Sequence, residues 1–222
     1  MIDLILSFGG SRKISRVVEE SSPWLLGSRP GDPVYSRVGF TDLDFKRLPD
    51  DAYLSKYAEF VKVTQPRYCV VPDLMVRWQI PATLRFAEEH LAPHAENLIL
   101  VPKVCDIIES LPHQIDGTPV ILGYSCNPSY GGTPVPFWEF GDRAVHLLGG
   151  SPKRQAYIAN YLNVGSLDGN YYTKIARYGR NIREDLSEAQ DVPGKDRDRY
   201  YECIKLSLNN IARYFEGIPH SL

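Results

Sequence analysis

No stretch of this 222-residue chain approaches the roughly 18 uninterrupted apolar residues that span a membrane. The first residues lack a basic leader and include an early acid, Asp3, so no secretory signal is expected. We therefore expect a soluble, cytoplasmic protein without a membrane partner.

Cysteines are few and follow no pattern. The four of them are widely spaced, with no C-x-x-C pair and no Cys/His cluster (Cys69, Cys105, Cys126 and Cys203). This scatter argues against a disulfide framework and against a structural zinc site. The chain also lacks a Walker phosphate loop, and no G-x-G-x-x-G follows its first apolar run. We expect neither a bound metal nor a cofactor.

An excess of charge of one sign is also lacking, since 25 Lys and Arg balance 27 Asp and Glu for a net charge of −2. This balance excludes a globally basic nucleic-acid binder but leaves room for a local basic patch. Lys174, Arg177 and Arg180 recur every three residues in a segment of helical character. We predict that they contact nucleic-acid phosphates. The alternative is a helix face that meets only solvent.

The composition is that of an ordinary globular protein, with 43% hydrophobic and 23% charged residues. From about residue 68, short apolar runs start roughly every 20–30 residues, the repeat of a strand followed by a helix. The runs are Leu4–Phe8, Tyr68–Val71, Leu98–Val101, Pro119–Gly123 and Ala144–Leu148. Their nearly continuous hydrophobicity is typical of parallel strands covered by helices. We predict one α/β domain over residues 1–222, a compact or partly degenerate (β/α)8 barrel of the TIM type. An open doubly wound sheet is the competing architecture.

Apolar residues at helical spacing predict three connecting helices, over residues 51–63, 81–91 and 153–162. The same spacing predicts a C-terminal amphipathic helix over about 196–216. Two stretches rich in proline and glycine, about 21–41 and 125–141, are predicted to be long loops. The second follows a strand, so we expect it at the catalytic end of the barrel.

Acidic side chains follow two of the apolar runs. Asp73 comes after Tyr68–Val71, and Asp168 closes a short run that lies one helix beyond the Gly149-Gly150 turn. Catalytic residues of such barrels gather at the carboxyl ends of the strands, so Asp168 is the first candidate. Two structural alternatives stay open. Asp168 can cap a turn with Gly169, and Asp73 can be the N-cap of the following helix.

Five segments in strand order share a family resemblance: Val70–Asp73, Leu98–Val104, Val120–Tyr124, His146–Pro152 and Asp168–Arg180. They resemble segments of the tRNA-guanine transglycosylase superfamily. Within this superfamily, the segments resemble most the phage and bacterial DNA 7-deazaguanine transglycosylase-like proteins that lack the zinc domain. His146–Pro152 is close to the family's LMGVG-x-P segment, and Asp168–Arg180 looks like the segment that holds the nucleophilic aspartate.

The resemblance implies an enzyme that exchanges guanine or 7-deazaguanine in a nucleic acid through a covalent aspartyl-pentose intermediate. Asp168 would trap the oxocarbenium-like centre as the nucleophile. Asp73 would accept the N–H groups of the base edge. The other substrate contacts implied are Lys103, Gly123, Tyr124, Leu148, Gly149 and Gly150. A base inside a duplex must first be extruded, and aromatic residues of the 125–141 stretch, such as Trp138, are candidate walls for it.

The chain also departs from the family. The early DSGGF motif, which holds the second catalytic aspartate, has no full counterpart in Ser7–Ser11 or Ser36–Phe40. Asp42 is our candidate for that acid, with Asp44 as the alternative. The cysteine-rich zinc segment and the RNA-binding extension are not found in this sequence, which favours DNA over tRNA as the partner of the purine or 7-deazapurine exchange. A homodimer is left open.

Other functions remain as alternatives. The same scaffold could remove a base with water, as a DNA glycosylase does. A barrel enzyme for a phosphorylated metabolite would use Gly149-Gly150-Ser151 to hold phosphate through backbone N–H groups. A member without activity would bind DNA or a partner, an alternative suggested by the missing early aspartate. His146, inside an apolar run, is interpreted as a hydrogen-bonded core histidine, with a catalytic role as the alternative.

Overall fold

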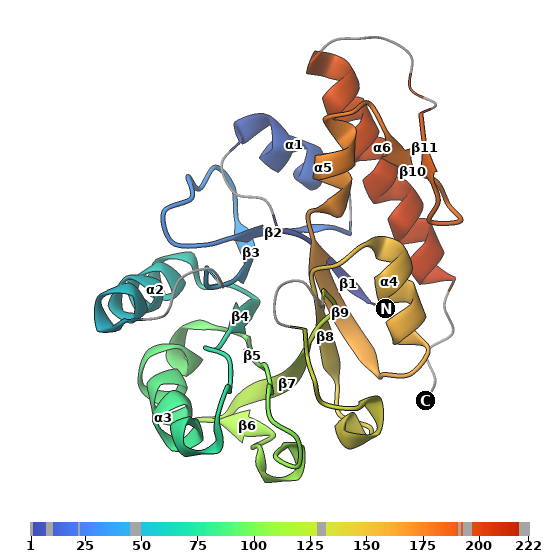
Figure 1. The fold of residues 1–222 in the computed structure, drawn as a ribbon. Helices are drawn as coiled ribbons and strands as arrows, with labels where there is room; N and C mark the ends of the chain where they lie inside the picture. Colours follow the sequence, from blue (N-terminus) through green and yellow to red (C-terminus); the bar gives the residue numbers. More distant parts are fainter. Residues whose placement is uncertain are drawn as a thin grey trace.

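Eight parallel strands close into a barrel, which Figure 1 shows as a ring. The structure, a computed structural model, describes residues 2–7, 11–21, 23–44, 50–127, 132–190, 192 and 197–217. The strands are β1 (Asp3–Ser7), β2 (Leu25–Ser28), β3 (Val38–Thr41), β4 (Tyr68–Val70), β5 (Asn97–Leu100), β7 (Thr118–Ser125), β8 (Val145–Leu148) and β9 (Val164–Gly169). Each pairs with the next in parallel, and β9 pairs with β1 to complete the ring. The predicted barrel of the TIM type is confirmed.

Because the strands run in one direction, their carboxyl ends share one rim. We call this rim, from Ser7 on β1 round to Asp168 on β9, the mouth of the barrel. The closing pair aligns Ile5 of β1 with Asp168. Side chains alternate between the interior and the outer wall. The interior is filled by a cluster of apolar residues, Ile5, Phe40, Tyr68, Val70, Ile99 and Val101.

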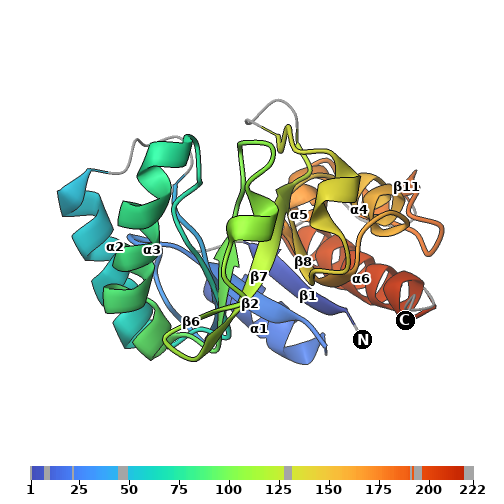
Figure 2. The same cartoon turned by 90° about the horizontal axis from the view of Figure 1, so that it is seen from below.

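Helices cover the outer wall unevenly, as Figures 1 and 2 show. They are α1 (Arg12–Glu20), α2 (Asp51–Thr64), α3 (Ile80–His90), α4 (Pro152–Ala159), α5 (Tyr171–Ala176) and α6 (Arg197–Glu216). α2 and α3 lie on one side of the ring, and α1, α5 and α6 lie on the other. The connection from β2 to β3, which is described throughout, contains no helix. Within the described residues, no helix combines the length and apolar character needed to cross a membrane.

Shorter elements complete the fold. They are the 3-10 turns η1 (Arg77–Gln79), η2 (Ala92–His94), η3 (Ile108–Ser110) and η5 (Phe137–Phe140), and the two-residue strands β6 (Gln114–Ile115), β10 (Asn181–Ile182) and β11 (Glu188–Ala189). β6 forms an antiparallel hairpin with β7, and β10 pairs with β11 in a small separate sheet.

Local sequence explains where the predicted helices begin. Asp50 caps α2, because its Oδ1 accepts the backbone N–H of Tyr53 over 2.7 Å. Ser151 caps α4 by accepting the N–H of Arg154 over 3.3 Å, and Pro152 fits the first turn. The predicted C-terminal helix is confirmed as α6. The indole of Trp24 donates to the carbonyl oxygen at position 208 over 3.0 Å and joins α6 to the start of β2.

The prediction of a long loop over 21–41 is wrong, because β2 and β3 lie within it. β2 contains Gly27, where a Cβ would come within 3.0 Å of both Phe40 Cδ1 and Ser7 Oγ. Glycine is needed there for close packing inside the barrel, although its sequence context looks like that of a loop. The 125–141 stretch contains the end of β7 and η5, and residues 128–131 within it lie outside the described residues.

Candidate active site at the mouth of the barrel

Asp168 lies at the carboxyl end of β9 and is only 5% exposed. Three groups hydrogen-bond to its carboxylate. Ser7 Oγ lies 2.6 Å from Oδ2, whereas Gly149 N and His146 Nε2 lie 3.0 Å and 3.2 Å from Oδ1. Donors that converge in this way stabilise the negative charge of a carboxylate. The alternative of Asp168 as a cap of its own turn does not hold, because none of these partners belongs to that turn.

His146 on β8 is fully buried and contacts both Asp168 and Ser166 of β9. Its Nδ1 lies 2.8 Å from Ser166 Oγ, and its ring stacks on Phe40 with centroids 5.2 Å apart. The two ring nitrogens thus each face one hydrogen-bond partner, the Ser166 hydroxyl and the Asp168 carboxyl group. His146 is thus a hydrogen-bonded core residue, as predicted, but it also positions the candidate nucleophile.

Ser7 was not predicted as a site residue, and His146 was predicted as a core residue with a catalytic role only as the alternative. A signal for His146 was present in strand alternation. His146 precedes Leu148 by two positions, and Ser166 precedes Asp168 by two, so each pair shares a face of its strand. Ser7 carried no comparable signal, because only closure of the barrel places β1 beside β9.

The turn after β8 supports the same carboxylate. Gly149 and Gly150 have φ values of +63° and +86°, a region that favours glycine. A Cβ on Gly150 would lie 2.9 Å from the Cβ of Cys126, so the turn also packs closely. Gln155 of α4 donates its side-chain N–H groups to the carbonyl oxygens of Gly149 and Asp168, over 2.9 Å and 2.6 Å. Gly149 therefore supports Asp168 through its N–H, whereas contact of Gly149 and Gly150 with substrate stays a prediction.

Asp42 follows β3 directly and lies near Asp168. Its surroundings disfavour a charged carboxylate, whereas three hydrogen-bond partners surround the Asp168 carboxyl group. Burial, and then the neighbouring charge of Asp168, raise the pKa of Asp42 well above its usual value near 3.8. The N–H of Leu43, 2.7 Å from Oδ1, opposes that rise only in part. An acid whose pKa is raised, beside a carboxyl group that receives three hydrogen bonds, is an arrangement that suits a general acid and a nucleophile.

Asp73 and Lys103 follow β4 and β5 and form an ion pair, with Nζ 3.6 Å from Oδ2. The lysine side chain is 7% exposed and that of the aspartate 41%. Burial raises the pKa of Asp73 and lowers that of Lys103, and each partner opposes the shift of the other. The alternative of Asp73 as a helix N-cap is wrong, because Val76 and Gln79 occupy the N-cap positions of η1 and α3.

Of the predicted substrate contacts on β7, Tyr124 faces the outer wall and Gly123 faces a filled interior. Tyr124 packs on the outer wall, with its ring centroid 5.3 Å from that of Phe137, because the preceding residue, Gly123, faces the interior. A Cβ on Gly123 would lie 2.7 Å from Val101 Cγ2, so no room is left there for a side chain. Gly123 therefore has a packing role. Leu148 packs against the interior cluster at the mouth, where it could lie under a heterocycle.

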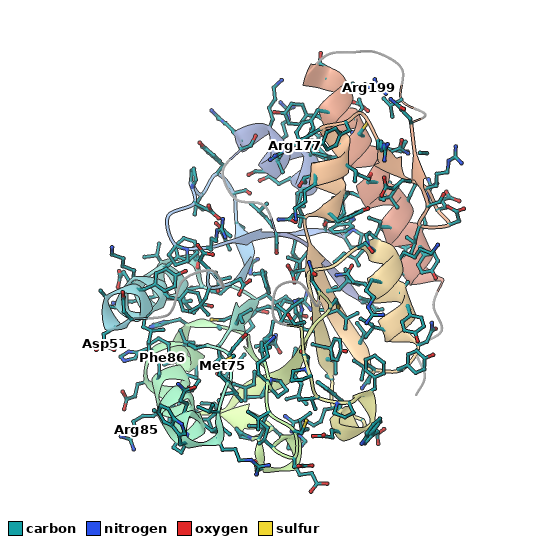
Figure 3. All side chains as sticks on the ribbon, viewed as in Figure 1. Asp51, Met75, Arg85, Phe86, Arg177 and Arg199 are labelled. Atoms are coloured by element: carbon teal, nitrogen blue, oxygen red, sulfur yellow. The ribbon has the colours of Figure 1, made fainter. Side chains whose placement is uncertain are left out.

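The predicted phosphate contacts do not share one helix face. α5 ends at Ala176, and Gly179 has a φ of +68°, so only Lys174 lies within the helix. Arg180 is paired with Glu188, 3.2 Å away. Figure 3 shows Arg177 at the end of α5 that lies away from the ring of strands. The prediction of a helical cation stripe is wrong, because the helix stops before the stripe is complete.

Within the described part of the chain, no group of three or more His, Cys, Asp or Glu side chains is placed to bind a metal. Two surface grooves, with volumes of about 400 and 490 Å³, lie on the outer wall beside β2 and β3 and between α2 and α3. Neither is lined by Asp42, Asp73 or Asp168. Residues 8–10, 45–49 and 128–131, which follow β1, β3 and β7, lie outside the described residues.

Comparison with known proteins assigns a family. Residues 28–216 match a family described as "Family of unknown function (DUF6610)". The chain belongs to this family. Searches of curated proteins and of solved structures found no match. The DUF6610 match runs from the end of β2 through α6, so it includes all three mouth aspartates but not Ser7.

Proposed function

We propose that the protein exchanges a purine or 7-deazapurine base in DNA through a covalent bond between Asp168 and the pentose. The observation that carries the proposal is the contrast between two neighbouring acids. Asp168 is held by three hydrogen-bond partners, while burial and Asp168 raise the pKa of Asp42. A nucleophile must be charged and a departing base must receive a proton, and these environments suit those two roles.

The reaction would proceed in two displacements. In the first, an oxygen of Asp168 attacks C1′ as the glycosidic C–N bond breaks. The bonding electron pair leaves with the base, which takes the proton of Asp42. In the second, the Asp42 carboxylate takes a proton from the incoming base, whose nitrogen attacks C1′ and releases Asp168. Ser7, His146 and Gly149 keep the nucleophile oriented in both steps.

Recognition of the base would fall to the next part of the rim. The Asp73 side chain is partly exposed, so its carboxylate is able to accept N–H groups from a guanine-like edge. Lys103, paired with Asp73, would orient that carboxylate or reach a base carbonyl. Leu148 would provide the apolar surface under the ring. This assignment keeps the base contacts on β4, β5 and β8, next to the two catalytic acids.

The phosphorylated-metabolite alternative has less support. A phosphate held by the Gly149-Gly150-Ser151 turn would need outward backbone N–H groups. The N–H of Gly149 is instead bonded to Asp168, and the hydroxyl of Ser151 caps α4. The turn therefore serves the carboxylate and the helix.

The test is incubation of the protein with labelled guanine and a panel of single-stranded DNA, duplex DNA, RNA and nucleosides. We expect label to enter DNA and a covalent protein–DNA adduct to survive on a denaturing gel. Asp168→Asn should abolish both and leave DNA binding intact. Asp116→Asn, the same change at an exposed turn residue, should have no effect.

Each outcome is decisive. An absence of label and adduct with every member of the panel would overturn the proposal. Exchange by Asp168→Asn at the wild-type rate would overturn the choice of nucleophile. Release of free base without incorporation would identify base removal, with water as the second nucleophile.

A further inference from the structure

The segment that follows Asp73 presents large apolar side chains to solvent. Met75, Val76 and Trp78 are 56%, 36% and 77% exposed. Figure 3 shows Met75 where the chain passes from β4 toward α3. The segment begins directly after Asp73, so the chain enters it from the mouth of the barrel.

The backbone of this segment is firmly held. The N–H of Leu74 donates to the carbonyl of Val101 over 3.0 Å, and the N–H of Lys103 donates to the carbonyl of Leu74 over 3.1 Å. The side chain of Leu74 is fully buried. Arg77 donates to the carbonyl of Cys105 over 3.0 Å, which fixes η1 to the connection after β5. The exposed side chains are therefore carried on an anchored support.

Three adjacent apolar side chains are too few for a protein partner. A stable protein interface buries about 800 Å² on each side and uses roughly 20–30 residues. Proteins that open base steps insert apolar side chains such as Met, Leu or Phe into them.

We propose that Met75 and Trp78 form a wedge that enters the base stack of duplex DNA when the target base turns into the mouth. This inference rests on the proposed function and extends it to the form of the substrate. Extrusion of a base costs a few kcal/mol of stacking and pairing. A wedge on the rim would offset part of that cost by filling the gap, while Asp73 receives the extruded base. A single strand or a free nucleoside has no stack to open and would not need it.

The experiment compares exchange of labelled guanine into duplex and single-stranded DNA of one sequence. For the Met75→Ala/Trp78→Ala variant, we expect the duplex rate to fall by about tenfold and the single-strand rate to change by less than about twofold. Val63→Ala is the control, since Val63 is 72% exposed at the end of α2 that leads into the start of β4, opposite the mouth. It should leave both rates unchanged. Equal losses on both substrates, or no loss on duplex, would overturn the wedge.

A binding measurement separates the wedge from the proposed chemistry. Fluorescence anisotropy would compare an intact duplex with a duplex that contains one abasic site, a preformed gap. The wild-type protein should bind the abasic duplex more tightly, and the double variant should lose that preference. If no substrate supports exchange, the proposed function fails, while this measurement still decides the wedge. Equal affinity of the wild-type protein for both duplexes would reject it.

Discussion

Ser7 on β1 donates its hydroxyl to Oδ2 of Asp168 on β9 over 2.6 Å, although the two residues are 161 positions apart in the chain. The contact crosses the seam where the first and last strands of the barrel meet. The pairing of β1 with β9 that closes the barrel therefore also brings Ser7 to the candidate nucleophile. Residues that look structural in sequence can therefore control the chemistry.

Ser7→Ala removes one hydrogen bond to this carboxylate. Hydrogen bonds to charged groups contribute about 1.5–3 kcal/mol, so we expect a loss of that order in the free energy of unfolding. The exchange rate should fall by about tenfold with little change in KM, because Asp168 is less well oriented. Urea unfolding and steady-state exchange measure the two effects. Ser15→Ala, which removes a 3.3 Å hydrogen bond within α1, should leave exchange unchanged, and an equal loss there would contradict the assignment.

Asp42→Asn should change how stability depends on pH. The pKa of Asp42 is raised in the folded state, so the folded protein holds a proton that the unfolded chain loses above its ordinary pKa. Stability therefore falls as pH rises from that ordinary value toward the raised one, by about 1.4 kcal/mol for each unit of difference. The variant lacks this loss, so its free energy of unfolding relative to wild type should be higher near pH 7 than near pH 4. Urea titrations at both pH values test this, and a pH-independent difference would contradict it. Exchange should be abolished at both.

His146→Phe keeps a ring against Phe40 but removes the hydrogen bonds to Ser166 and Asp168. Buried groups left without a partner cost about 1–3 kcal/mol, and we expect a loss of unfolding free energy of that size. Exchange should fall by more than about tenfold, since one support of the nucleophile is gone. His90→Phe is the matched control, because His90 is an exposed histidine beside Phe86. An identical loss of exchange in both variants would argue against a positioning role.

Gly123→Ala tests whether this glycine serves packing. Its Cβ would lie 2.7 Å from Val101 Cγ2 and 3.1 Å from Leu148 Cδ1, so side chains of the barrel interior must shift. Overpacking of this kind costs about 1–3 kcal/mol, measurable as a lower urea midpoint. Gly165→Ala on β9 has nothing within 4 Å of the new Cβ and should be close to neutral. Similar losses in the two variants would show that strand propensity, not interior space, sets the effect.

The apolar runs indicated parallel strands covered by helices, a pattern that suits both a barrel and an open doubly wound sheet. The pairing of β9 with β1 decides for the barrel. The pattern of apolar runs failed over 21–41, where β2 and β3 are four residues each and lie among prolines and glycines. It also failed for Tyr124, because strand position does not reveal which face is interior. The predicted helical stripe of cations ends with α5 at Ala176, and the left-handed backbone of Gly179 follows. The spacing of the charges could not reveal either feature.

The order of residues was enough to place acids at the ends of strands, because Asp168 and Asp73 follow apolar runs and parallel strands end at one rim. The surroundings of these acids depend on the folded barrel. Asp168 meets Ser7, His146 and Gly149, and the pKa of Asp42 rises, because the register across the closing strands and the depth of burial set those distances. Strand register and depth of burial both depend on contacts between residues far apart in the chain. A local sequence pattern therefore does not predict them.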